Sequence, residues 1–253
     1  MTHQHFSIGL IGYGRFGKLL ARYLAAYVPV RVFDSRMRQL TSSKRCLRSS
    51  LREAAACPVV ILAVPVSSLR TLLVAIAPLL LKGTLIIDVC AVKTIPTEWM
   101  RKLLPRDVYL LGSHPLFGPQ SAGSSLDGHS IVLCPVRLPE RLLRRIRAHL
   151  KGNGLQVVTM TPRSHDRAIA DSLLVTQFVG RSLELAGVRR ARVITPAHKR
   201  LLSIVDTVKG DSRQLFDDLV RYNPYSAPMI KKLTKGHDKL LSSISHNGFG
   251  SDF

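Results

Sequence analysis

The spacing of hydrophobic residues alternates between two patterns along the N-terminal part of the chain. Short apolar runs rich in β-branched residues, typical of strands, occupy residues 6–11, 30–33, 59–64, 85–89, 108–111 and 130–134. Segments with apolar residues at helical spacing lie between them, at residues 16–27, 67–80 and 140–150. The alternation predicts an α/β fold, a doubly wound parallel sheet of the Rossmann type that is covered by helices on both faces.

The pattern changes after a last β-like run at residues 157–160. From about residue 164 onward the apolar residues recur at helical spacing, in segments 164–186, 196–208, 212–222 and 227–245. The sequence therefore predicts two domains: a dinucleotide-binding Rossmann domain at residues 1–163, and a smaller all-helical domain at residues 164–253 for substrate binding and dimerisation. Four amphipathic helices are too few for a large core, so we expect a homodimer that forms through the helical domain.

Composition narrows the class of partner. The chain carries 37 Lys and Arg against 16 Asp and Glu, a formal charge of +21, which suggests nucleic acid, an acidic membrane surface or an anionic substrate. The basic residues are scattered, with no aromatic-interleaved RNA motif and no zinc-finger spacing, so a solvated surface rich in lysine and arginine is the preferred interpretation. We therefore expect no specific nucleic-acid partner and no metal site. A small anionic substrate would still gain from the positive field.

The cysteines and the apolar stretches bear on location. Cys46, Cys57, Cys90 and Cys134 stand far apart with no CxxC pair, and no signal sequence leads the chain, which favours a reducing cytoplasm. Proline, serine and arginine interrupt the longest apolar stretches before they reach membrane-spanning length, so we expect no membrane segment.

The strongest motif is a Gly-x-Gly-x-x-Gly turn that follows the first strand and opens the first helix. Gly12 permits a tight turn, Gly14 lets the backbone approach a pyrophosphate, and Gly17 allows close packing of helix on strand. The N–H groups at the start of the helix would hold the phosphates. We therefore assign the whole turn to a nicotinamide dinucleotide: Gly12, Tyr13, Gly14, Arg15, Phe16 and Gly17.

Asp34, at the end of the second strand, can accept hydrogen bonds from the adenosine ribose hydroxyls. This favours NAD, because a 2′-phosphate would meet a carboxylate. Arg36 and Arg38 follow and could clamp that phosphate, so NADP stays an alternative. Val64 and Pro65, after a central strand, are predicted to line the nicotinamide pocket, although they could serve only as strand and turn.

A second motif follows the strand at residues 108–111. Residues 112–121 hold one histidine, two glycines and two prolines in what should be a rigid loop. A histidine such as His114 can accept the proton of an alcohol while the alcohol carbon gives a hydride to a nicotinamide. The spacing by itself leaves a purely structural histidine open.

At this loop the chain resembles the prephenate and arogenate dehydrogenases of tyrosine biosynthesis, whose signature is similar to His-Pro-Met-Phe-Gly-Pro-(Glu/Asp)-Ser. The resemblance extends to the glycine turn and to residues 88–93, Asp-Val-Cys-Ala-Val-Lys against a family pattern like Asp-Val-Leu-Ser-Val-Lys. It continues through His165-Asp166 and residues 179–181 to residues 206–223, which look closest to the plant-type arogenate enzymes. Nearly the whole chain is covered.

The resemblance implies an oxidative decarboxylation. His114 would deprotonate the ring hydroxyl, a hydride would leave that carbon for NAD(P)+, and carbon dioxide would depart as the ring becomes aromatic. Lys93, Gln120 and Ser121 are the implied contacts to substrate, together with His165, which could instead cap a helix. The product would be 4-hydroxyphenylpyruvate from prephenate or tyrosine from arogenate.

Two departures from the family pattern bear on the substrate. Ala91 stands where the family has a serine that touches the substrate hydroxyl, and Gln177 stands where a second histidine is common. Gln177 can still form hydrogen bonds, so we keep it among the substrate-binding candidates. Two other functions therefore stay open: a relative that oxidises a different cyclohexadienyl compound, and a dinucleotide-binding protein without catalysis.

Overall fold

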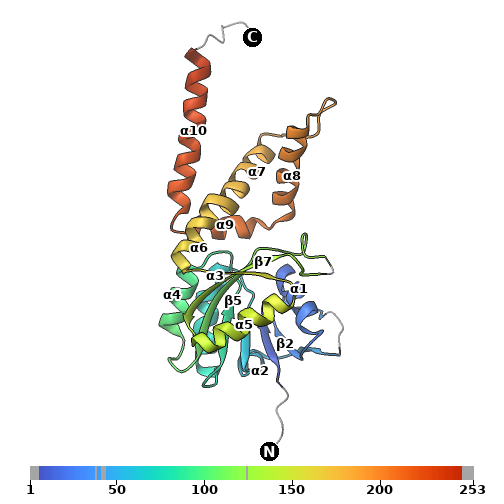
Figure 1. The fold of residues 1–253 in the computed structure, drawn as a ribbon, viewed down its shortest axis with the longest axis vertical. Helices are drawn as coiled ribbons and strands as arrows, with labels where there is room; N and C mark the ends of the chain where they lie inside the picture. The colour runs from blue at the N-terminus through green and yellow to red at the C-terminus, as the bar shows by residue number, and fades with distance from the viewer. Residues whose placement is uncertain (1–5, 38, 41–43, 124, 247–253) are drawn as a thin grey trace, which may run out of the picture. The chain divides into compact units, whose positions relative to one another are not determined.

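The computed structural model describes residues 6–37, 39–40, 44–123 and 125–246 (Figure 1). The chain forms two compact units, Met1–His165 and Asp166–Phe253, which are described in turn.

The first unit is built on one eight-stranded sheet. Its strands are β1 (Ile8–Ile11), β2 (Val30–Phe33), β3 (Cys46–Arg48), β4 (Val59–Leu62), β5 (Leu85–Asp88), β6 (Tyr109–Pro115), β7 (Ser130–Arg137) and β8 (Gln156–Thr159). Their order across the sheet is β3-β2-β1-β4-β5-β6-β7-β8. Residues in the middle of the central strands, such as Leu10, Val60, Ile86 and Leu110, are fully buried. This burial explains the continuous apolar runs in the sequence.

One pair of strands departs from the parallel arrangement expected from the sequence. β6 and β7 are antiparallel, with His114 opposite Val132, whereas every other neighbouring pair in the sheet is parallel. A parallel return needs a long crossover, usually a helix. The described residues between β6 and β7 contain no helix, so the chain turns back beside the strand that it has just left. The sheet is therefore mostly parallel.

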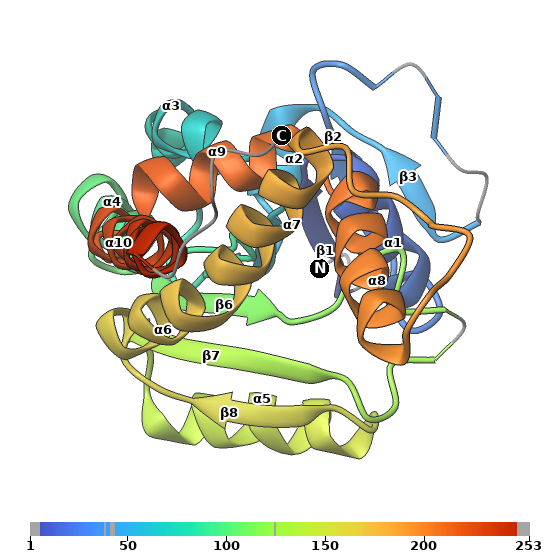
Figure 2. The ribbon, with the colours of Figure 1, turned by 90° about the horizontal axis from the view of Figure 1, so that it is seen from above.

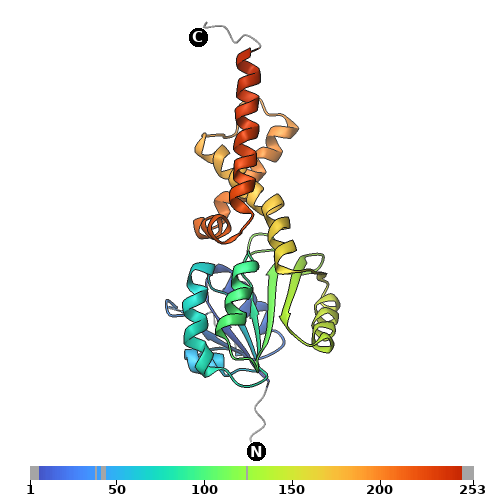
Figure 3. The same ribbon diagram turned by 90° about the vertical axis from the view of Figure 1, so that its left-hand side faces the viewer.

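Helices cover both faces of this sheet. They are α1 (Arg15–Leu24), α2 (Leu51–Ala55), α3 (Val66–Ile76) with the 3-10 turn η1 (Ala77–Leu79), α4 (Thr94–Leu103) and α5 (Glu140–Gly152). Figure 3 shows α3 and α4 on one face of the sheet and α5 on the other. The fold is thus the doubly wound arrangement that the sequence predicts.

The hydrophobic pattern of the sequence did not predict three elements of the first unit. β3 has three residues and α2 has five, which is too short for a periodic signal, although Ser50 and Glu53 form a capping box at the start of α2. α4 begins directly after Lys93 and contains Pro96 in its first turn, so its local sequence resembles a loop.

The second unit is helical in its described residues. The segment expected as one helix at 164–186 consists of α6 (Pro162–Ile169), the π-helical turn η2 (Ala170–Leu174) and α7 (Val175–Leu185), with the first four residues of α6 in the first unit. The rest of the second unit consists of α8 (Pro196–Gly210), α9 (Arg213–Tyr222) and α10 (Ser226–His246).

Figure 2 shows α7 and α8 side by side. Their close approach needs Gly180, because a Cβ atom there would lie 2.8 Å from Val208 Cγ1. None of the described helices is both long and apolar enough to cross a membrane.

Candidate active site

The glycine turn after β1 forms an open cradle. Gly12 has a φ of +105°, a conformation that favours glycine, and its N–H donates to the carbonyl of Phe33 at 2.8 Å. A Cβ atom on Gly17 would lie 2.1 Å from the Gly12 carbonyl oxygen, whereas one on Gly14 would meet no heavy atom of the described part of the chain within 4 Å. Among the residues that the structure describes, no side chain caps the start of α1. Open backbone beside an uncapped helix start fits a bound pyrophosphate.

Asp34 joins this turn to the end of β2. Its Oδ2 accepts the backbone N–H of Tyr13 at 2.7 Å, and its Oδ1 accepts the backbone N–H of Arg36 at 2.7 Å. Each carboxylate oxygen has a second lone pair, so a ribose hydroxyl can still bind there. Tyr13 is buried, and the side chains of Arg15 and Arg36 are exposed. Arg38, the other candidate for a 2′-phosphate, lies outside the described residues.

Val64 and Pro65 lie beside the cradle. They follow β4, with Val64 half-buried and Pro65 exposed at the start of α3. A Cβ atom on Gly12 would lie 3.1 Å from Val64 Cγ1, and the Val64 carbonyl accepts from the Cys90 thiol at 3.7 Å. The fold thus brings the end of β4 against the glycine turn, as expected for a pocket at the carboxyl edge of the sheet.

Two histidines meet at the end of β6. His114 Nδ1 lies 2.9 Å from His165 Nε2, and the two rings form a T-shaped pair with centroids 5.1 Å apart. Both side chains are buried, His114 with 7% of its surface exposed and His165 with 1%. One of these nitrogens must donate to the other, so the tautomers of the two rings are linked. Nε2 of His114 is then the ring nitrogen that does not face His165.

His165 is not a helix cap. Thr161 takes that place, because its Oγ1 accepts the N–H of Ser164 at 3.1 Å and its carbonyl accepts the N–H of His165 at 3.0 Å. The capping alternative from the sequence is therefore wrong, and His165 reaches His114 from within α6.

The surroundings of His114 favour a neutral ring. Burial is the largest cause that holds the pKa of His114 well below its usual value of 6.5, followed by the charges of His165 and Lys93. A neutral imidazole can accept a proton, which is the state that a general base requires.

A buried ion pair lies next to this site. Lys93 Nζ donates to Asp88 Oδ1, and neither side chain is exposed to solvent. Gly112 makes room for the pair, because a Cβ atom there would lie 3.2 Å from Lys93 Cδ and 2.8 Å from Thr97 Cγ2. Asp88 Oδ2 has no hydrogen-bond partner among the described residues. The expectation that Lys93 touches substrate directly does not fit this burial.

The two remaining candidates of the first unit lie in the loop between β6 and β7. Gln120 and Ser121 are both exposed, and Ser121 Oγ accepts the N–H of Gly118 at 3.0 Å. They follow His114 closely in sequence, so the loop presents them near the carboxyl edge of the sheet.

Gln177 lies in the second unit, and both the nitrogen and the oxygen of its side-chain amide form hydrogen bonds. It is fully buried, its Nε2 donates to Asp211 Oδ2 at 2.6 Å, and its Oε1 accepts from Arg181 Nε at 3.2 Å. Both halves of the amide thus bind within the helical unit, which speaks against the expected contact of Gln177 with substrate. The sequence could not indicate this bridge, because its partners lie on other turns and helices.

Comparison with known proteins places these features in a family. Residues 34–159 match the profile described as prephenate dehydrogenase, nucleotide-binding domain, and residues 182–247 match the one described as TYRAAT1-like, C-terminal domain. The chain is 32% identical over 174 residues to arogenate dehydrogenase 2, chloroplastic, of Arabidopsis thaliana, which covers 67% of this chain and 48% of that protein. It is 27% identical over 254 residues to arogenate dehydrogenase 1, chloroplastic, of the same plant, covering 95% and 39%. The chain spans less than half the length of either relative.

A solved structure shares the fold. The prephenate dehydrogenase of Aquifex aeolicus, crystallised with hydroxyphenyl propionate and NAD+, matches with a TM-score of 0.72 at 16% identity, over 98% of this chain and 93% of that one. The sheet and its glycine turn define a nucleotide-binding domain of the dehydrogenase type, followed by a helical domain. The chain belongs to the prephenate/arogenate dehydrogenase family, NAD(P)-dependent dehydrogenases connected with tyrosine biosynthesis.

Proposed function

We propose that this chain catalyses the NAD(P)-dependent oxidative decarboxylation of prephenate or arogenate. The observation that carries the proposal is the buried pair of His114 and His165, at the same sheet edge as the glycine cradle. The two plant relatives are named arogenate dehydrogenases, and the Aquifex protein was crystallised in complex with hydroxyphenyl propionate and NAD+. A buried histidine pair at this edge favours catalysis over a dinucleotide-binding protein without chemistry, because a neutral imidazole can act as a general base.

His114 is the proposed general base. Its Nδ1 faces His165, so Nε2 accepts the proton of the ring hydroxyl. The bond from carbon to hydrogen breaks with its electron pair, which a nicotinamide held at the glycine turn would accept as hydride. The bond to the ring carboxylate then breaks, carbon dioxide leaves, and its electrons complete the aromatic ring and reach the oxygen. That oxygen takes the proton back from His114, which returns the base to its neutral state.

His165 and Lys93 are proposed as positioning residues. His165 holds the tautomer of His114, because the hydrogen on Nδ1 must point at its partner when Nε2 is to accept. The charge of Lys93 lowers the pKa of His114, after burial and His165, and so helps to keep the base neutral. Asp88 holds the Lys93 ammonium in its buried place. Gln120 and Ser121 stay the proposed hydrogen-bonding contacts to substrate.

The proposed dinucleotide ligands are the residues of the glycine turn, with Asp34 at the adenosine ribose. NAD is our first proposal, because the Asp34 carboxylate stands at the end of β2. Arg36 is exposed beside it and could bind a 2′-phosphate, so NADP is the competing cofactor. Val64 and Pro65 would lie against the nicotinamide.

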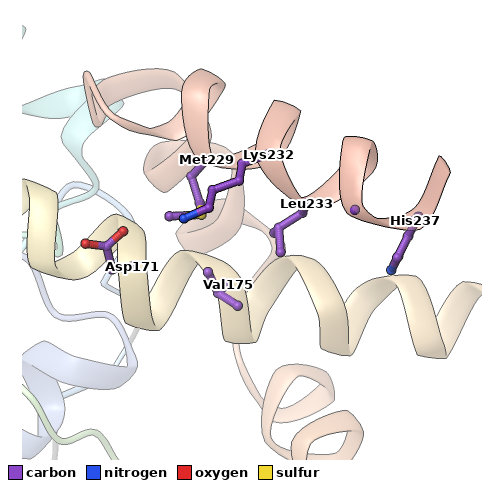
Figure 4. A pocket seen from close by; sticks show the side chains of 7 residues that line it. Asp171, Val175, Met229, Lys232, Leu233 and His237 are labelled. Atoms are coloured by element: carbon purple, nitrogen blue, oxygen red, sulfur yellow. The ribbon is translucent and has the colours of Figure 1, made fainter. Parts of the chain in front are cut away.

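The helical unit supports a proposal of self-association. It exposes several large apolar side chains, among them Leu185 at 87% and Leu241 at 63%. A shallow groove of about 660 Å³ runs between η2, α7 and α10, with Asp171, Val175 and Leu233 in its lining (Figure 4). We propose that this unit pairs with a second copy of the chain, which light scattering coupled to gel filtration would test. A monomer at micromolar concentration would contradict it.

A reducing compartment is also proposed. Cys46, Cys57, Cys90 and Cys134 are all free and buried, as expected where thiols stay reduced. The names of the two plant relatives specify the chloroplast, so this proposal concerns redox conditions, and the cytoplasmic expectation stays a prediction.

The central test is an absorbance assay at about 340 nm, where reduced nicotinamide absorbs, with purified protein. NAD+ and NADP+ would each be combined with prephenate and with arogenate. We expect reduction in at least one of the four mixtures and aromatic product by chromatography. No reduction in any mixture, by protein that binds dinucleotide, would contradict the proposed function. Turnover of only another cyclohexadienyl alcohol would favour the alternative relative.

A further inference from the structure

The loop after His114 is hydrogen-bonded to α1, the helix that follows the glycine turn. Arg22 Nη2 and Tyr23 Oη, both near the end of α1, donate to the same carbonyl oxygen, that of Gly123, at 2.7 and 3.1 Å. The two donors lie about a hundred residues from Gly123 in sequence, so the contact joins two separate parts of the fold. The bond from the Arg22 guanidinium is charge-assisted, the stronger class of hydrogen bond.

The two donors also support each other. The Arg22 guanidinium lies over the Tyr23 ring, with its carbon 5.1 Å from the ring centroid. Arg22 and Tyr23 are adjacent in the helix. The stacking nevertheless directs the guanidinium and the hydroxyl toward the same carbonyl oxygen, that of Gly123.

The same helix and loop meet again close to the glycine turn. The rings of Phe16, in the first turn of α1, and Phe117, in the loop, have centroids 6.3 Å apart at an interplanar angle of 50°. Pro119 of the loop and Arg15 and Lys18 of α1 share the lining of one cavity of about 580 Å³. The loop therefore contacts α1 near both of its ends.

The loop is internally tied between these contacts. Ala122 is buried, with 1% of its surface exposed, and its N–H donates to the Gly118 carbonyl at 2.8 Å. The N–H of Ser121 donates to the same carbonyl at 3.1 Å. Because residues 118–122 form a single hydrogen-bonded turn, the place of Gly123 determines the place of Gln120 and Ser121.

We propose that Arg22 and Tyr23 are positioning residues that couple the dinucleotide site to the loop bearing Gln120 and Ser121. A dinucleotide held at the start of α1 fixes the helix, and the two side chains transmit this order to the loop at residues 116–123. The role in substrate binding rests on the proposed function, whereas the ordering of the loop by dinucleotide does not.

Hydrogen exchange of the full chain tests the coupling without any turnover. We expect NAD+, or NADP+ if it binds more tightly, to slow exchange at residues 116–123 in the wild-type protein. Tyr23→Phe, which keeps the ring, and Arg22→Met should each raise exchange there and weaken the protection by dinucleotide. Tyr27→Phe is the matched control, because Tyr27 lies just beyond α1 with 67% of its surface exposed. Unchanged exchange in both variants would overturn the proposal.

Steady-state kinetics tests the consequence for substrate. The loss of one hydrogen bond should raise the KM for substrate about threefold to tenfold in Tyr23→Phe, with the dinucleotide Kd and kcat within about twofold of wild type. A fall in dinucleotide affinity equal to the rise in KM would mean that the residues only support α1, which would also overturn the proposal. A wild-type chain without turnover would contradict the proposed function, and the exchange experiment would still decide this inference.

Discussion

Nδ1 of His114 lies 2.9 Å from Nε2 of His165, although 51 positions separate the two residues in sequence. The contact joins the end of β6 to α6 and withdraws both rings from solvent. It also links the tautomer of one imidazole to that of the other, because one of the two facing nitrogens must donate to its partner. A base that is neutral, buried and fixed in one tautomer is what proton abstraction from a hydroxyl needs.

Replacement of His114 should remove catalysis and spare cofactor binding. Asparagine keeps a polar side chain of similar size but cannot accept a proton at neutral pH, so His114→Asn should lower kcat by about a hundredfold to ten-thousandfold. Dinucleotide affinity, measured by fluorescence titration, should stay within about twofold of wild type. If binding is lost with turnover, the histidine loop supports the fold rather than the chemistry.

The pH profile should extend to the acid side. Because the pKa of His114 lies well below 6.5, the base stays neutral as the pH falls past that value, and the acid limb of kcat/KM should lie below it. Lys93→Met removes one of the charges that lower this pKa, so the acid limb should move to higher pH in that variant. An acid limb at or above pH 6.5 in the wild type, or an unmoved limb in the variant, would contradict this account.

The same lowered pKa has a consequence for stability. Below pH 6.5 the unfolded chain binds a proton at position 114, whereas the folded protein does not until the pH reaches the lower folded pKa. The unfolded state thus holds more protons, and the free energy of unfolding rises with pH across this window. Urea denaturation at several pH values measures this dependence. The free energy of unfolding should rise less steeply with pH in His114→Asn than in wild type.

The ion pair of Asp88 and Lys93 should matter most when it is broken on one side. Lys93→Met leaves a buried carboxylate without its cation, which costs about 3 to 5 kcal/mol in comparable pairs. The double variant Asp88→Asn with Lys93→Met removes both charges and should recover much of that loss. Urea denaturation of the two proteins gives the comparison. A double variant that is less stable than Lys93→Met would mean that the carboxylate does more than hold the lysine.

The glycine turn permits a separation of binding from folding. Gly14→Ala adds a Cβ atom where none of the described residues has a heavy atom within 4 Å, so the melting temperature should hardly change. The methyl group would stand where the pyrophosphate approaches, and dinucleotide affinity should fall at least tenfold. Gly152→Ala, at the end of α5, is the matched control, since its Cβ atom also meets no heavy atom of the described residues within 4 Å. Equal dinucleotide affinity in Gly14→Ala and wild type would mean that the phosphates do not bind at this turn.

Local patterns are enough to predict much of the fold. The strands β2 and β4 and the helix α5 begin at the predicted residues, because buried strands and amphipathic helices leave their period in adjacent residues. The glycine turn could be predicted equally well, because the positive φ at Gly12 and the close packing at Gly17 both require glycine at a fixed place in the local sequence. The motif around His114 indicates the family and the candidate base, because its residues are adjacent in the chain.

Contacts between distant segments had to come from the tertiary structure. The sequence could not show that His165 faces His114. It could not show that the side-chain amide of Gln177 is hydrogen-bonded to Asp211 and Arg181. The buried ion pair of Lys93 with Asp88 was equally absent from the sequence pattern. The antiparallel turn from β6 to β7 and the fastening of Gly123 by Arg22 and Tyr23 were also invisible. Periodicity reports which face of an element is buried. The partner on that face depends on how the chain packs, and packing brings together residues that share no local pattern.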